Sequence, residues 1–208
     1  MARNSGSVRA AANLNSRDLI LNAARTLIDE KGYDGMAVSE LCTASGFPAS
    51  SIYYHFGSKL GVLAALLERT FEEMHALFPG PGAFDHLAPM ERFEAWFSGA
   101  CRTLDKHPDY LRLLVATGVG PHKDTDEAQH TLRRIRDSAH ASWVSALTPI
   151  FAPAGGRANK ALVEKLAILG RAVTDGLAVA NNVDSITYSS EVAAFLQLIR
   201  SLAETRSS

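Results

Sequence analysis

The residues best suited to chemistry lie between positions 45 and 59, in the stretch SGFPASSIYYHFGSK. Two adjacent tyrosines, Tyr53 and Tyr54, precede His55, and Lys59 closes the stretch. Hydroxyl, imidazole and ammonium groups hydrogen-bond to phosphates and base edges, so these side chains could contact a nucleic acid. The alternative is that they are ordinary surface or packing residues of a small helical subdomain.

The sequence lacks the common signatures of catalysis and metal binding. It has no phosphate-cradling glycine loop, no histidine pair at metal-ligand spacing on a helix, and no serine in a nucleophile elbow. The scattered histidines are interpreted as surface or core residues: His75, His86, His107, His122, His130 and His140. We therefore expect no catalytic residue, no metal site and no cofactor, and the alternative is a helical enzyme or small-molecule-binding protein without DNA affinity.

Composition indicates a folded globular chain with one sizeable core, or a small domain attached to a larger one. The chain has 208 residues and 47% apolar content, enough to bury such a core. A net charge of −1 says little about nucleic acid, because the local charge matters. The first seventeen residues hold three arginines and no acid, which predicts either a flexible basic arm or a merely solvated tail.

The cysteines and the N-terminus indicate a cytoplasmic protein. Cys42 and Cys101 are too few and too far apart to form a disulfide framework or a metal knuckle. The N-terminus has no apolar signal-peptide core, and no segment approaches the roughly 18 apolar residues of a membrane span. We expect no membrane segment.

Apolar residues recur at helical spacing along the chain, and strand-like alternation is missing after residue 84. Pro48 suits a first helical turn, and Gly32, Gly46 and Gly57 suit helix ends. A helix of about two turns is expected around Val38, Leu41 and Cys42, stopped by Gly46. The other expected helices are 15–32, 48–56, 58–78, 89–106, 108–119, 124–151, 158–183 and 189–204. The sequence thus predicts an all-α fold.

The helix expected at 48–56 has an apolar face and a polar face. Ala49, Ile52 and Phe56 share one face and would pack against the two preceding helices. The outward rows pair Ser50 with Tyr54 and Ser51 with His55, and Tyr53 borders the two faces. Small residues at the first end and larger hydrogen-bonding groups at the second suit a helix that enters a major groove.

Residues 19–66 resemble the N-terminal DNA-binding domain of the TetR (tetracycline-repressor) family of bacterial transcriptional regulators. The matching features are the Gly32-Tyr33 pair, Val38 and Leu41, the Ala44-x-Gly46 turn, Ile52-Tyr53-x-His55-Phe56, and Lys59. The resemblance implies a helix-turn-helix formed by the second and third helices, a connecting fourth helix, and a larger helical domain that binds a small molecule and dimerises. The corresponding boundaries are a basic arm at 1–14, a DNA-binding domain at 15–61, and a ligand-binding and dimerisation domain at 62–208.

The resemblance also assigns roles to individual residues. It places Pro48, Ala49 and Ser50 near the bases, and gives Lys59 a phosphate next to the start of the fourth helix. The full set of expected DNA-binding residues is Arg17, Ser39, Pro48, Ala49, Ser50, Ser51, Tyr53, Tyr54, His55 and Lys59. Met36 and Ala37 depart from the family pattern, because threonine or serine often caps the second helix there and touches phosphate.

The function implied is a ligand-responsive regulator, a repressor, that binds a palindromic operator as a homodimer and is released by a small molecule. Aromatic and sulfur side chains could line its pocket, or could simply fill the core: Phe71, Met74, Trp96, Phe97, Cys101 and Trp143. Dimerisation is expected through the last two helices, at about 158–204, unless their apolar faces are internal core. Those faces comprise Leu162, Leu166, Leu169, Val173, Leu177, Ala180, Val192, Leu196, Ile199 and Leu202.

Overall fold

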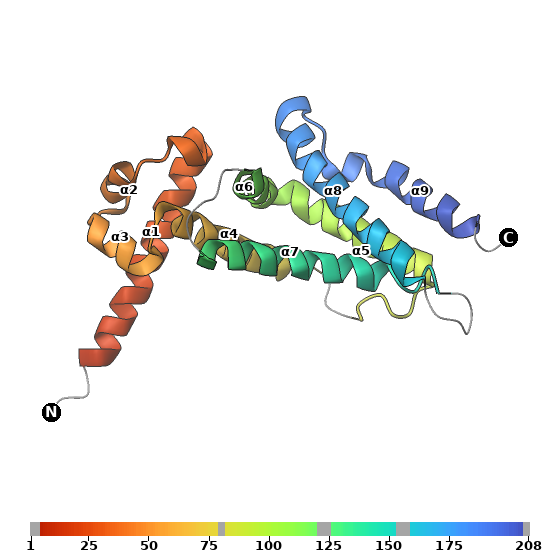
Figure 1. Cartoon of the computed structure of the whole chain (residues 1–208), viewed down its shortest axis with the longest axis horizontal. Coiled ribbons are helices and arrows are strands. Elements are labelled where there is room, and N and C mark those ends of the chain that lie inside the picture. Colours follow the sequence, from red (N-terminus) through yellow and green to blue (C-terminus); the bar gives the residue numbers. More distant parts are fainter. Residues whose placement is uncertain (1–4, 79–81, 120–125, 153–158, 206–208) are drawn as a thin grey trace. The chain divides into compact units, whose positions relative to one another are not determined.

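The structure is a computed structural model that describes the backbone of residues 5–78, 82–119, 126–152 and 159–205, and the side chains from residue 16 onward outside 116–128. All regular elements in these described ranges are helices (Figure 1). The expectation of an all-α fold is confirmed. Of the described residues, those up to 70 and those within 116–132 pack as a first unit, and those within 71–115 and from 133 onward pack as a second.

The first unit contains α1 (Ser5–Gly35), α2 (Val38–Ser45), α3 (Ala49–Phe56) and most of α4 (Lys59–His75). Helix α1 begins at Ser5, ten residues before the start expected from the sequence. Its helical backbone is interrupted at Gly32, where φ is 74°, a left-handed value that glycine adopts without the penalty of a Cβ. The interruption falls at the position where the sequence predicts the helix end.

The core of the first unit comes from the apolar faces that the periodicity predicts. Ile20 of α1, Ile52 of α3 and Leu63 of α4 are completely buried. Met36 is also fully buried, so this departure from the family pattern serves packing. Burial of each such side chain contributes roughly 1.5–3 kcal/mol, which holds α3 in place by its inner face.

The turn between α3 and α4 is tight. Gly57 ends α3 with φ at 70°, and the Ser58 hydroxyl accepts the backbone N–H of Gly61 at 3.0 Å. Ser58 therefore caps the start of α4, as the sequence predicts. A Cβ at Gly61 would lie 1.8 Å from the carbonyl oxygen of Phe56, so only glycine fits beside the end of α3.

The second unit contains α5 (Pro89–Lys106), α8 (Lys160–Asp184), a short 3-10 helix η1 (Tyr188–Ser190) and α9 (Val192–Glu204). The larger parts of α6 (Pro108–Val119) and α7 (Asp126–Leu147) also belong to the second unit. The ends of α5 and α6 agree with the expected ranges 89–106 and 108–119. The Asp105 carboxylate accepts the backbone N–H groups of Tyr188 and Ser189, at 2.7 and 3.1 Å, and so ties η1 to α5.

Candidate functional site

The outer surface of α3 is polar and largely exposed. The Tyr54 side chain is 77% exposed and Tyr53 is 49% exposed, and Ser50 is also exposed. Ile52 and Phe56 are buried on the opposite face. The division between a packing face and an outward face is as the sequence predicts, and Tyr53 proves to lie half outside.

His55 departs from the expected outward orientation. It is half-buried, and its Nε2 lies 3.0 Å from the Ser16 hydroxyl of α1. The next residue along each helix also forms a contact, since the Arg17 guanidinium of α1 lies 5.6 Å from the centre of the Phe56 ring of α3. The outward interpretation of His55 was therefore wrong, because its imidazole is directed at Ser16 of α1.

Lys59 also has partners inside the first unit. Its ammonium donates to the carbonyl oxygen of Asp34 at 3.3 Å and lies 4.5 Å from the centre of the Tyr33 ring. A lysine ammonium has three donors, so these contacts leave donor capacity. The Tyr33 ring and the Asp34 carbonyl therefore hold the ammonium at the start of α4 and leave some of its N–H donors available to another partner.

The start of α2 compensates for the missing hydroxyl cap. Ala37 precedes the helix, and its backbone N–H donates to the Glu40 carboxylate at 3.2 Å. Lys31 of α1 pairs with the same carboxylate at 2.6 Å. The hydrogen bond from Lys31, then the Ala37 N–H and then the Lys31 charge hold the pKa of Glu40 below its ordinary value.

The exposed surface of α2 and α3 is nearly free of charge. Residues 32–58 contain no lysine or arginine, and Asp34 and Glu40 are their acids. Among the other expected DNA contacts, Ser39 and Pro48 are exposed, and Arg17, Ala49 and Ser51 are half-buried. This surface offers hydroxyl groups and small apolar groups, which suit contacts to base edges and neutral hydrogen bonds to phosphate.

The second unit brings three of the expected ligand-binding residues together. The ring of Trp143 lies 5.2 Å from Trp96 and 5.4 Å from Phe97, centre to centre. Phe93 and Phe195 complete this aromatic cluster, with Phe195 5.0 Å from Phe97. Neither belongs to the set of ligand-binding residues expected from the sequence, although the spacing of Phe93 and Phe97 on one helix could have added the first.

The other expected ligand-binding residues, Phe71, Met74 and Cys101, do not contribute rings to this cluster. Phe71 and Met74 belong to α4, and the Phe71 ring lies 5.9 Å from that of Tyr110 of α6. Cys101 is fully buried in α5, and burial, followed by the nearby Asp105 charge, raises the pKa of its thiol to about 12. The thiol is therefore protonated at neutral pH and suits packing better than reaction.

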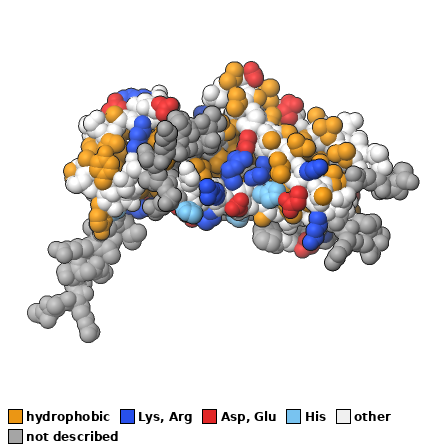
Figure 2. Space-filling view, in the orientation of Figure 1, with side chains coloured by type: hydrophobic (Ala, Val, Ile, Leu, Met, Phe, Trp, Pro, Cys, Tyr) orange, Lys and Arg blue, Asp and Glu red, His pale blue; other side chains and the backbone are white. Residues whose placement is uncertain are grey.

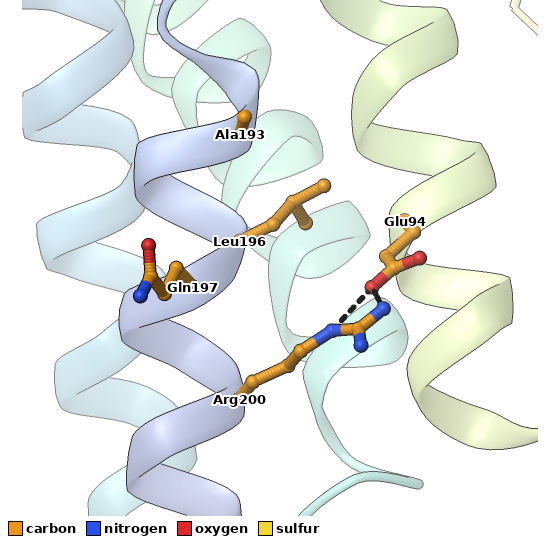
Figure 3. A pocket seen from close by; sticks show the side chains of 5 residues that line it. All are labelled: Glu94, Ala193, Leu196, Gln197 and Arg200. Carbon is orange, nitrogen blue, oxygen red and sulfur yellow. Dashed lines mark hydrogen bonds and ion pairs between the residues drawn. The ribbon is translucent and has the colours of Figure 1, made fainter.

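A groove opens on the surface between α5 and α9 (Figure 3). Leu196 points from α9 toward α5, and the Arg200 guanidinium donates to the Glu94 carboxylate across the groove, with 2.7 Å from Nε to Oε1. The lining residues are Glu94, Ala193, Leu196, Gln197 and Arg200. None of the ligand-binding residues expected from the sequence lines this groove.

Two buried tyrosines and an ion pair add polar groups to the second unit. Burial, the larger cause, and the Asp175 charge raise the pKa of Tyr110. Burial raises the pKa of Tyr188 to about 12. Arg136 of α7 pairs with Asp175 of α8 at 3.1 Å, so the second unit contains hydrogen-bonding groups as well as aromatic rings.

Helix α8 exposes a continuous apolar stripe, and hydrophobic side chains are prominent over α8 and α9 in Figure 2. Its exposed large residues fall on one helical face: Ile168, Leu169, Val173, Val179 and Val183. Helix α9 likewise exposes Leu198 and Leu202. The faces expected from the sequence were partly wrong, because Leu166 and Ile199 are buried inside the chain and the exposed stripe is rotated away from them.

The described ranges offer neither a metal site nor a membrane span. There, no group of three or more histidine, cysteine, aspartate or glutamate side chains is placed to hold a metal ion. None of the helices in the described part of the chain is both long enough and apolar enough to cross a membrane.

Sequence comparison finds bacterial regulators. Residues 20–66 match the profile of the family described as bacterial regulatory proteins, tetR family. The biofilm operon icaADBC HTH-type negative transcriptional regulator IcaR of Staphylococcus epidermidis is 24% identical over 138 residues, 64% of this chain and 70% of that protein. Its Staphylococcus aureus counterpart is 32% identical over 59 residues, 28% of this chain and 32% of that protein, so that match spans about a third of its length.

Solved structures share the fold. A putative TetR transcriptional regulator from Streptomyces avermitilis has a TM-score of 0.68 and 23% identity, over 91% of this chain and 98% of that one. The transcriptional regulator FadR from Bacillus subtilis, in complex with stearoyl-CoA, has a TM-score of 0.63 and 17% identity, over 87% and 96%. At these identities the likeness concerns the fold alone, and it extends through both units.

Proposed function

We propose that this chain is a transcriptional repressor of the TetR family of bacterial regulatory proteins, and that it binds a palindromic operator as a homodimer. One observation carries this proposal. The buried side of α3 fixes the helix to its unit, while Tyr54, Tyr53 and Ser50 stand outside. A tyrosine that is 77% exposed on a short helix adds little to the core and is free to meet a partner.

Helix α3 would enter a major groove, with its N-terminal end nearest the bases. Pro48, Ala49 and Ser50 are small, so the backbone can approach base edges. The hydroxyls of Tyr53 and Tyr54, with Ser51 beside them, would hydrogen-bond to phosphate or bases. Ser39 at the start of α2 would add a neutral contact.

The cationic contacts to phosphate would come from residues on either side of α2 and α3. Lys59 has donor capacity beyond Asp34 and stands at the start of α4, where the free backbone N–H groups also favour anions. Arg17 is half-buried beside Phe56 and would supply a second, weaker phosphate contact. His55 is the exception in the expected set, because its Nε2 is already bonded to Ser16.

The apolar stripe of α8 supports dimerisation. Valine and leucine side chains that are 39–70% exposed along one helix face leave apolar surface in water, and such patches commonly mark protein interfaces. Gly176 has open space around it, which would let a second helix approach closely. A second copy of this chain, presenting α8 and α9, would cover the stripe in a two-fold interface.

A small molecule in the second unit would release the operator. The IcaR relatives are described as negative regulators, and the Bacillus subtilis FadR structure holds stearoyl-CoA, a ligand with a large apolar part. In this chain the aromatic cluster around Trp96, Phe97 and Trp143 would offer an apolar wall to such a molecule. Release requires that the effector bind more tightly to the conformation with low DNA affinity.

Capture of genomic DNA tests the proposed function. Sheared DNA from the source organism is incubated with the protein, and the bound fragments are sequenced. We expect a small set of fragments that share an inverted repeat, and no enrichment with Tyr54→Ala. Leu77→Ala is the control, because Leu77 is 56% exposed and lies outside α2 and α3. Failure of the wild-type protein to enrich any sequence would overturn the proposal.

A further inference from the structure

Two consecutive residues of α1 meet two consecutive residues of α3. The Ser16 hydroxyl lies 3.0 Å from His55 Nε2, and the Arg17 guanidinium lies 5.6 Å from the centre of the Phe56 ring. Ser16 is only 8% exposed and Phe56 only 7%. We call this set of four residues the α1–α3 clasp.

We propose that His55 is a positioning residue, which orients the reading helix by its bond to Ser16 and does not itself bind the operator. This inference rests on the proposed function, because it concerns how α3 is presented to DNA. It changes the role expected for His55, which the family resemblance places among the phosphate or base contacts.

The geometry separates His55 from its neighbours on α3. Tyr54 is 77% exposed, whereas His55 is half-buried and its Nε2 is directed to another helix. Its ring also contacts Tyr54 and Phe56, with centres 5.2 and 5.9 Å apart. The imidazole therefore bridges α1 to the exposed tyrosine on one side and to the buried phenylalanine on the other.

The clasp acts on the last turn of α3. Helix α3 spans Ala49–Phe56, and its buried anchors are Ile52 and Phe56. Two apolar anchors on one side limit translation more than rotation about the helix axis, whereas a directed hydrogen bond at the last turn limits rotation. Rotation of α3 would move Tyr54 and Ser50 out of register with base edges, so loss of the bond should weaken operator binding.

The test is a double-mutant cycle on the full-length protein. His55→Asn shortens the side chain so that its amide cannot reach Ser16, whereas His55→Gln places an amide near the former Nε2. Ser16→Ala removes the partner. Thr26→Ala is the matched control, because it removes a hydroxyl bond to Asn22 within α1, at 3.2 Å, with no link to α3. Operator affinity and thermal unfolding are measured for each variant.

We expect His55→Asn and Ser16→Ala each to weaken operator binding about tenfold, the size of one ordinary hydrogen bond. The double variant should be no weaker than either single variant, because both remove the same bond. His55→Gln should recover most of the affinity, and Thr26→Ala should change nothing. Equal effects of His55→Asn with and without Ser16 would overturn the inference, since they would mean that His55 binds DNA directly.

The unfolding measurements separate this inference from the proposed function. Non-additive unfolding of the Ser16 and His55 variants would support the clasp even if no operator were found, and only the regulatory role would then fail. Additive unfolding of the same variants would overturn the clasp, whatever DNA the protein binds.

Discussion

Removal of the Lys59 ammonium should lower the salt dependence of operator binding. Residues 32–58 carry no lysine or arginine, so few cations can neutralise phosphate near the reading helices. Each phosphate contact contributes a slope of about −0.9 to a plot of log affinity against log salt concentration. Lys59→Ala should therefore reduce the slope by about 1.8 for the two copies in a dimer. Between 50 and 200 mM salt, the variant should lose about twelvefold less affinity than the wild-type protein.

Lys31→Ala is the matched control for this measurement. It removes the same charge from the same unit, but the Lys31 ammonium is bound to Glu40 at 2.6 Å. Fluorescence anisotropy with a labelled operator at five salt concentrations gives all three slopes. Lys59→Ala should also cost about 0.5–1 kcal/mol of stability through the lost contact with the Tyr33 ring, which thermal unfolding reports separately.

Equal slopes for wild type and Lys59→Ala would refute the reasoning. In that case the ammonium would serve only to bind Asp34 and Tyr33, and Lys59 would leave the set of DNA contacts. A slope lowered as much by Lys31→Ala would refute it in another way, because the change would then report general charge.

Three further predictions concern packing, pH and assembly. Gly170→Ala should lower the unfolding temperature, because its Cβ would lie 2.5 Å from the buried Trp143 ring and overpacking costs about 1–3 kcal/mol; an unchanged unfolding temperature would contradict this. Glu40→Gln should destabilise the protein at neutral pH, and the difference should vanish in acid, because a folded-state pKa below its ordinary value gives stability that is lost as pH falls; a pH-independent difference in unfolding temperature would contradict this. Val179→Lys should convert the dimer to a monomer in sedimentation, because Val179 is 52% exposed on the α8 stripe, whereas Leu77→Lys should not; a dimeric Val179→Lys protein would exclude this face.

Most helices could be predicted from the sequence because local signals mark their ends. Pro89, Pro108 and the glycines at 46 and 57 fix starts and stops through backbone geometry that depends on one residue. Helix α1 was harder, because SGSVRAAANL lacks a clear apolar stripe, and the sequence placed the start at Asn15 or Ser16. The structure begins the helix at Ser5.

The orientation of side chains could be predicted only where one helix face decides it. Ile52, Phe56 and Tyr54 follow from spacing along α3, and they lie as expected. His55 does not, because its partner Ser16 is 39 residues away, and spacing within α3 cannot reveal it. The exposed face of α8 was predicted incorrectly for the same reason. Leu166 and Leu169 are equally apolar, and only tertiary packing buries Leu166.

The most direct test of the central claim uses an operator recovered by genomic capture, with five base pairs inserted between its half-sites. Half a helical turn places the second half-site on the opposite side of the duplex, where a two-fold dimer with one α3 per copy cannot reach it. We predict that affinity falls by at least a hundredfold, toward the level of unrelated DNA. Unchanged affinity for the lengthened operator would contradict paired reading by two copies of α3.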